Sequence, residues 1–247
     1  MVPDCAVLVT CEHGGHRVPA EWHALFRGHE SLLRSHRGWD PGALAAARVM
    51  ARSLGVPVVA SRTTRLLVDL NRSSGRAWSS VTRPLPRRQR EGILQAHWRP
   101  YREAVESRVA LHVGAGRAVL HVSMHSFTPV LEGRVRNADI GLLYDPSRAR
   151  ERAVADAWAR ALRQSGPALR VRRNYPYLGI ADGLTTHLRR RFDDVRYAGI
   201  ELELNQALAT GPAAAALRRA VAVALRTALR TAPRAATTGA AGDAQES

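Results

Sequence analysis

The chain has 247 residues, 45% of them hydrophobic, which is enough to bury one large core or two small ones. Its formal net charge is +16, and all 37 basic residues are arginine. These arginines are scattered and not interleaved with aromatic residues, so we expect no nucleic-acid binding but a positive field that attracts small anionic substrates. No apolar run approaches the roughly 20 residues that span a bilayer, so we expect no membrane association.

In the N-terminal half, strands alternate with helices. Hydrophobic periodicity predicts, in chain order, a strand at 6–9, helices at 19–33 and 43–53, strands at 56–60 and 65–70, and a helix at 87–113. Asp40 followed by Pro41 is typical of a helix start, and Pro100 predicts a break or kink. The segment 73–86, rich in Ser, Gly and Pro, predicts a long loop over the site.

The C-terminal half continues this alternation. It is predicted to contain strands at 118–124, 139–144, 171–177 and 198–204, with helices at 147–164, 182–191 and 212–232. Seven strands alternating with helices predict an α/β fold, in which a mostly parallel or mixed sheet lies between helical layers. We expect one domain over residues 1–232 and a disordered tail at 233–247, which has few bulky apolar groups.

The two cysteines, Cys5 and Cys11, lie six residues apart around the first predicted strand. An extended chain separates such residues by roughly 20 Å, which is too far for a disulfide. We therefore expect reduced thiols in a cytoplasmic protein, in keeping with an N-terminus that lacks the features of a secretory signal.

Two histidines stand at the ends of apolar runs. Glu12 and His13 come just after the first predicted strand, and His125 follows the apolar run 118–124. Open α/β sheets bind ligands at the carboxyl ends of their strands. Each histidine alone could be a capping or core-edge residue, but two in the same setting predict a metal site, such as a zinc ion with three protein ligands and one open position.

The sequence offers three candidates for the third metal ligand. Asp40 can face back across the sheet edge, although it can equally serve only as a helix N-cap. Glu12 and His16 are the alternatives. Six other histidines lie mostly in helices or inside strands and are interpreted as structural: His23, His36, His97, His112, His121 and His187.

Acidic residues also occupy the last predicted strand. Glu201 and Glu203 alternate with apolar residues, so both side chains point to one face, which is either a solvated surface or a site. We interpret Glu203 as the general base that takes a proton from water at the metal.

Substrate contacts are predicted after the third strand. Asn71 and Arg72 offer an amide and a guanidinium fork for a carboxylate, although a surface arginine is the simpler interpretation. Asp69 is expected to orient this pair, and Arg65 is a candidate second anion contact.

Further along the chain, Asp182 and Thr185 follow the turn at 174–179. They are candidates to complete the substrate pocket, or else form an ordinary helix cap.

Five motifs in this order resemble those of the N-formylglutamate amidohydrolase (N-formylglutamate deformylase) family. They are TCEHGGHRVP at 10–19, HRGWDPG at 36–42, DLNR at 69–72, SMHSFT at 123–128 and GIELELN at 199–205. The resemblance covers nearly the whole chain up to the last helix.

The resemblance implies a three-layer αβα sandwich of the phosphorylase/hydrolase type, related to zinc carboxypeptidases, aspartoacylases and cell-wall amidases. It puts His13 and His125 in the places of the two zinc histidines, Asn71-Arg72 in that of the pair that holds a substrate carboxylate, and Glu203 in that of the base. Carboxypeptidases place a glutamate ligand where this chain has His16. Cell-wall amidases take their acidic ligand from the helix after the first strand, which favours Asp40.

The implied activity is that of a zinc amidohydrolase in amino-acid catabolism. It would cleave the N-formyl amide of an acidic amino acid such as N-formyl-L-glutamate, releasing formate and glutamate, with one Zn²⁺ or another divalent ion. The alternatives are a related amidase that acts on another N-acyl amino acid or peptide, and a basic non-catalytic nucleic-acid-binding protein. The latter predicts a steeply salt-dependent affinity for DNA or RNA.

Overall fold

A six-stranded sheet forms the centre of the molecule, of which the computed structural model describes residues 5–165 and 169–231. The strand order is β2-β1-β3-β8-β6-β7, and only the β6–β8 pair is antiparallel within this sheet. The strands are β1 (Cys5–Cys11), β2 (Val58–Ala60), β3 (Ala118–Phe127), β6 (Ile140–Leu143), β7 (Val171–Arg173) and β8 (Tyr197–Asn205). The predicted α/β fold with a mixed sheet is confirmed.

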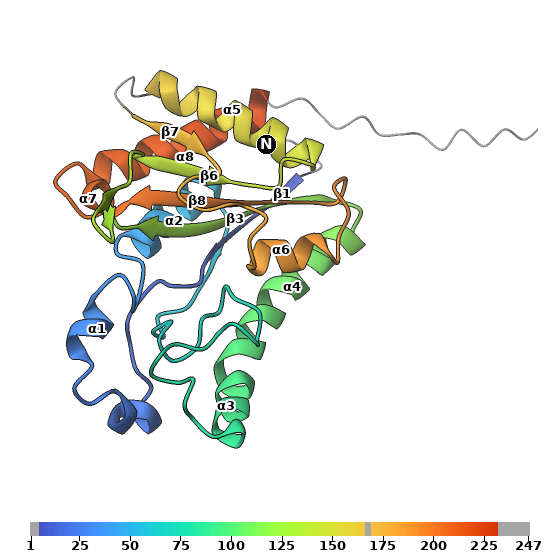
Figure 1. The fold of residues 1–247 in the computed structure, drawn as a ribbon. Helices are drawn as coiled ribbons and strands as arrows, with labels where there is room; N and C mark the ends of the chain where they lie inside the picture. The colour runs from blue at the N-terminus through green and yellow to red at the C-terminus, as the bar shows by residue number, and fades with distance from the viewer. Residues whose placement is uncertain (1–4, 166–168, 232–247) are drawn as a thin grey trace, which may run out of the picture.

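Helices cover both faces of this sheet (Figure 1). On one face lie α2 (Ala43–Leu54), α5 (Ala149–Ser165) and α8 (Ala214–Thr231), whose apolar residues share one buried cluster with the strands. On the other face lie α4 (Arg99–Gly114) and α6 (Leu184–Arg189), which contribute to a second cluster. The result is a three-layer αβα sandwich.

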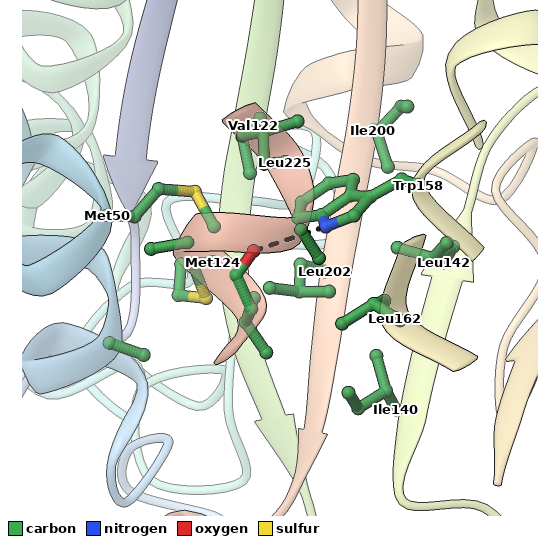
Figure 2. Packing of buried hydrophobic residues seen from close by; sticks show 14 of the residues in the cluster. Met50, Val122, Met124, Ile140, Leu142, Trp158, Leu162, Ile200, Leu202 and Leu225 are labelled. Atoms are coloured by element: carbon green, nitrogen blue, oxygen red, sulfur yellow. Dashed lines mark hydrogen bonds between the residues drawn. The ribbon is translucent and has the colours of Figure 1, made fainter. Parts of the chain in front are cut away.

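Strand alternation decides which face of the sheet can carry polar groups. Trp158 of α5 is fully buried against the apolar side, and its indole N–H donates to the Val221 carbonyl of α8 at 3.3 Å (Figure 2). Apolar side chains of the two central strands point to this face, namely Val122, Met124, Ile200 and Leu202. Because neighbouring residues in a strand point to opposite faces, the polar residues between them face α4 and α6.

A smaller lobe lies beyond the carboxyl end of the sheet (Figure 1). It contains the 3₁₀ helix η1 (Ala20–Phe26), α1 (Glu30–Arg34), the loop 61–86 and α3 (Arg87–Ile93). It has its own apolar cluster, which includes Phe26, Leu66, Leu67, Leu70 and Ile93. Packing in this lobe holds the segment with Asn71 and Arg72 in place.

The prediction of a strand at 65–70 is wrong. This segment forms turns, in which the Leu67 N–H donates to Thr64 and the Asp69 N–H to Ala77. Its apolar residues are buried in the small lobe rather than in the sheet. A short apolar run indicates burial but does not by itself indicate a partner strand, which explains the error.

Several helix boundaries also differ from the prediction. The helix predicted at 19–33 is split, with Gly28 (φ +79°) between η1 and α1. The helix predicted at 87–113 is continuous but contains a π-helical turn, η2 (Leu94–Trp98), just before Pro100. Proline has no N–H to donate to the preceding turn, so a distortion at this point has a local cause.

Three short elements were not predicted: the hairpin of β4 (Val130–Leu131) and β5 (Arg134–Val135), and α7 (Gln206–Ala209). Both cysteines are free thiols. In the described part of the chain, no helix is both long and apolar enough to cross a membrane. The predicted tail at 233–247 lies outside the described residues.

Candidate active site

Three buried side chains converge at the carboxyl end of the sheet. One ligand atom from each of His13, Asp40 and His125 lies within 4.8 Å of the others. Asp40 Oδ2 is 3.3 Å from Nδ1 of His13 and 2.9 Å from Nδ1 of His125. Residues more than a hundred positions apart in the sequence therefore form one group, as the strand-end positions of the two histidines predict.

Asp40 reaches this group because of the turn before α2. Its backbone N–H donates to the His13 carbonyl at 2.9 Å, which ties the two segments together. Gly42, with φ +85°, occupies the N-cap of α2. The Gly42 position requires the left-handed conformation, which glycine adopts without steric cost. Asp40 is therefore not the N-cap, and its carboxylate points to the histidines.

The far side of each imidazole is held by another carboxylate. His13 Nε2 lies 2.7 Å from Asp69 Oδ1, and His125 Nε2 lies 3.2 Å from Glu12 Oε2 and 2.9 Å from Ser123 Oγ. Carboxylates behind metal-binding histidines fix the ring orientation and the tautomer. Both Nδ1 atoms are thus directed towards Asp40, and two imidazoles with one carboxylate are a donor set typical of catalytic zinc. The residues present fit a divalent cation.

Neither alternative third ligand joins the group. Glu12 lies behind His125, where it accepts hydrogen bonds from Ser123 at 2.6 Å and from the Tyr101 hydroxyl at 3.0 Å. His16 is exposed, and its ring packs 5.1 Å from that of Trp39.

Ionised carboxylates and protonated histidines stabilise one another in this cluster. Burial opposes ionisation of Asp40, but His13 and His125 outweigh it and hold the pKa of Asp40 well below its ordinary value. Burial likewise opposes protonation of His125, but hydrogen bonds to Asp40 and Glu12 raise its pKa well above the ordinary value. A divalent cation can replace such protons, since metal binding is coupled to their release.

Glu203 differs from the other carboxylates of the site because one of its oxygens is both buried and without a hydrogen-bond partner among the described residues. It lies opposite His125 in the β3–β8 register, it is buried, and Oε2 has no hydrogen-bond partner among the described residues. Burial, supported by Asp40 and Glu201, raises the pKa of Glu203 to about 7. Glu201 by contrast accepts a hydrogen bond from Thr185 at 2.7 Å.

Asn71 and Arg72, the predicted substrate contacts, form hydrogen bonds with the start of α6 and the residues just before it. Arg72 donates from Nη1 to the Asp182 carbonyl, while Asn71 Oδ1 accepts from the Leu184 N–H at 2.7 Å. The Asp182 carboxylate in turn accepts from the Ser73 N–H and hydroxyl, both at 3.0 Å. Asp182 thus supports the loop that carries Asn71 and Arg72.

Arg65 is occupied by carboxylates of the site itself. Its Nε and Nη2 donate to Asp69 at 3.1 and 2.6 Å, and Nη1 donates to Asp40 at 3.4 Å. The structure therefore places Arg65 as a neutralising partner of the acids around His13. Its expected contact with a substrate anion stays a prediction.

A cavity of about 150 Å³ joins these groups. The four groups of the candidate centre, His13, Asp40, His125 and Glu203, line it. The predicted contacts Arg65, Asn71, Arg72 and Asp182 also line it, as do Glu201, Thr128, Arg136 and Tyr177. Thr185, a candidate to complete the substrate pocket, is not among the residues that line this cavity.

Sequence reasoning missed two roles at this site. Asp69 was expected to orient Asn71, and the structure does show its Oδ1 accepting from the Asn71 N–H at 3.0 Å. Its second contact, to His13, and the contact of Glu12 with His125 had no sequence signal, because the partners lie 56 and 113 positions apart. Thr128 is inside a quoted motif, but no pattern distinguished Arg136 from the other arginines.

Known proteins resemble this chain in sequence and in fold. A family model described as N-formylglutamate amidohydrolase matches residues 5–210. The crystal structure of gene product Atu2144 from Agrobacterium tumefaciens is similar, with 31% identity, a TM-score of 0.79, and coverage of 91% of this chain and 90% of that one. N-formylglutamate amidohydrolase from Ralstonia eutropha JMP134 is 20% identical, with a TM-score of 0.66 and coverage of 91% and 93%. No curated protein matches the chain.

Proposed function

The chain belongs to the N-formylglutamate amidohydrolase family, and on that premise we propose that it is a zinc-dependent amidohydrolase acting on N-formyl-L-glutamate or a close N-acyl relative. The observation that carries the proposal is the convergence of His13, Asp40 and His125 beside the unpaired carboxylate oxygen of Glu203. With water, N-formyl-L-glutamate would give formate and glutamate.

His13, Asp40 and His125 would hold the cation, for which their two imidazoles and one carboxylate favour zinc. When bound, such a cation acidifies water and polarises a carbonyl group. Asp69 and Glu12 keep the two imidazoles oriented for this task.

Glu203 would move the proton. Its carboxylate takes a proton from the attacking water and later donates it to the nitrogen of the departing amine. A general base is most effective when its pKa is close to the working pH, and in the metal-free site burial moves the pKa of Glu203 up from its ordinary value, towards neutrality.

Asn71 and Arg72 would hold a carboxylate of the substrate. Because Asn71 Oδ1 already accepts from the Leu184 N–H, its amide NH₂ group is left to donate. Arg72 uses one nitrogen on the Asp182 carbonyl and keeps its other N–H groups for a ligand. Fixing the substrate at this end would place the scissile amide over the metal ligands.

A substrate panel tests the proposal. N-formyl, N-acetyl and N-succinyl derivatives of glutamate and aspartate would be offered to the purified protein with and without a chelator. We expect formate release from N-formyl-L-glutamate, its loss on chelation and its recovery with added zinc. Release that is insensitive to metal removal would contradict the mechanism, and no release from any compound would contradict the substrate class.

A further inference from the structure

One arginine in the wall of the cavity differs from its neighbours. Arg136, directly after β5, lines the same cavity as Glu203 and Arg72. Its guanidinium stacks 5.0 Å from the ring centre of Tyr177 and 5.9 Å from that of Phe127. Within 5–165 and 169–231 it pairs with no carboxylate. Of the other two arginines that line the cavity, Arg65 donates to Asp69 and Asp40, and Arg72 donates to the Asp182 carbonyl.

A buried hydroxyl lies in the same part of the wall. Thr128 is only 9% exposed, and its Oγ1 has no hydrogen-bond partner among the described residues. The Arg136 N–H donates to the Pro129 carbonyl at 2.8 Å, so the chain next to Thr128 is joined directly to Arg136. Buried polar groups are nearly always paired, so an unpaired hydroxyl in a cavity wall calls for a partner from a ligand or water.

A substrate with two carboxylates requires a second positively charged side chain. The proposed function, on which this inference rests, gives one carboxylate of the substrate to Asn71 and Arg72. A dicarboxylic amino acid brings a second carboxylate into a cavity that also contains Asp40, Glu201 and Glu203. A carboxylate taken out of water among other acids is unfavourable unless a positive group pairs with it.

We propose that Arg136, together with Thr128, binds the second carboxylate of the substrate and so selects N-acyl dicarboxylic amino acids over neutral ones. The guanidinium carbon lies over the rings of Tyr177 and Phe127, and these cation–π contacts help to hold the group in the cavity wall. Its edge, which carries the N–H groups, is left for bidentate pairing with a carboxylate.

The kinetic test compares N-formyl-L-glutamate with its neutral isostere N-formyl-L-glutamine. Wild-type protein should prefer the glutamate derivative. Arg136→Met should raise KM for that compound by about 10- to 100-fold, as expected when a charged hydrogen-bond donor to a carboxylate is removed, and should leave the glutamine derivative nearly unchanged. Thr128→Val, which removes only the hydroxyl, should raise KM by about 3- to 10-fold. Arg134→Met is the matched control, since Arg134 is an exposed arginine of the same hairpin.

A binding test separates this inference from the proposed reaction. Calorimetric titration would compare glutarate with its monoamide, glutaramate, using zinc-loaded wild-type, Arg136→Met and Arg134→Met proteins. We expect the wild type and Arg134→Met to prefer glutarate and Arg136→Met to lose that preference. If no N-formyl amino acid is hydrolysed but this pattern holds, the subsite stands and the proposed reaction is wrong. Equal binding by the wild type, or an undiminished preference in Arg136→Met, would overturn the subsite.

Discussion

His121 and His125 lie on the same face of β3, four residues apart, and both are buried. Their surroundings shift the two pKa values in opposite directions. Burial lowers the pKa of His121 to about 4, whereas hydrogen bonds to Asp40 and Glu12 outweigh burial and raise that of His125. A neutral histidine and a candidate metal ligand therefore share residue type, strand and burial.

The difference comes from what surrounds each ring. Both nitrogens of His121 meet hydroxyl groups of neighbouring strands, Thr10 at 2.8 Å and Tyr197 at 2.8 Å. At the carboxyl end of the sheet, loops can reach the ring, and Asp40 arrives from the loop before α2. The interior of the sheet offers only neighbouring strand residues, so chemistry concentrates where strands end.

The largest difference in zinc content and activity is expected between variants of these two histidines. We expect His125→Ala to lose bound zinc and to reduce formate release from N-formyl-L-glutamate to background, because one of three ligands is missing. His121→Gln should keep both, although it unfolds at a lower temperature. Metal analysis, turnover and thermal denaturation of the two variants would check this. Equal zinc content in both variants would contradict the assignment of His125.

The two acids of β8 give a second contrast. Glu203→Gln should lower kcat by about 10²- to 10⁴-fold, the range for loss of a general base, while zinc stays bound. Glu201→Gln, two residues earlier and hydrogen-bonded to Thr185, should have a much smaller effect. Steady-state rates and zinc content of both variants are the measurements. A comparable loss of kcat in the two variants would argue against a distinct role for Glu203.

The smallest effect concerns stability and pH. His121 has a folded pKa of about 4, below the 6.5 of the unfolded chain, so the unfolded state binds the proton first as pH falls. Its contribution to stability is fully present above pH 6.5 and is lost as pH falls towards 4, by at most about 3 kcal/mol. We expect chelator-treated His121→Gln to lose less stability than the wild type between pH 6.5 and 4.

Thermal unfolding at several pH values would test this. His23→Gln, which changes an exposed histidine, serves as the control. An acid-side slope in His121→Gln as steep as that of the wild type would mean that other groups control this range.

Local patterns in the sequence determined a large part of this molecule. An apolar run predicted β3 and period-two alternation predicted β8. The polar residues at or near the ends of β1, β3 and β8 pointed to His13, His125 and Glu203. These features depend on contacts within a few residues, which is why a linear pattern records them. The family motifs are similarly local.

Only the tertiary structure decided what surrounds those residues. It placed Asp40, rather than Glu12 or His16, beside Nδ1 of both histidines, and it put 65–70 into a second lobe instead of a strand. It also left Arg136 with no acidic partner among the described residues. Each outcome depends on how loops pack against distant elements. The contact between Glu12 and His125 spans 113 positions, and no local pattern of charge or hydrophobicity encodes such a distance.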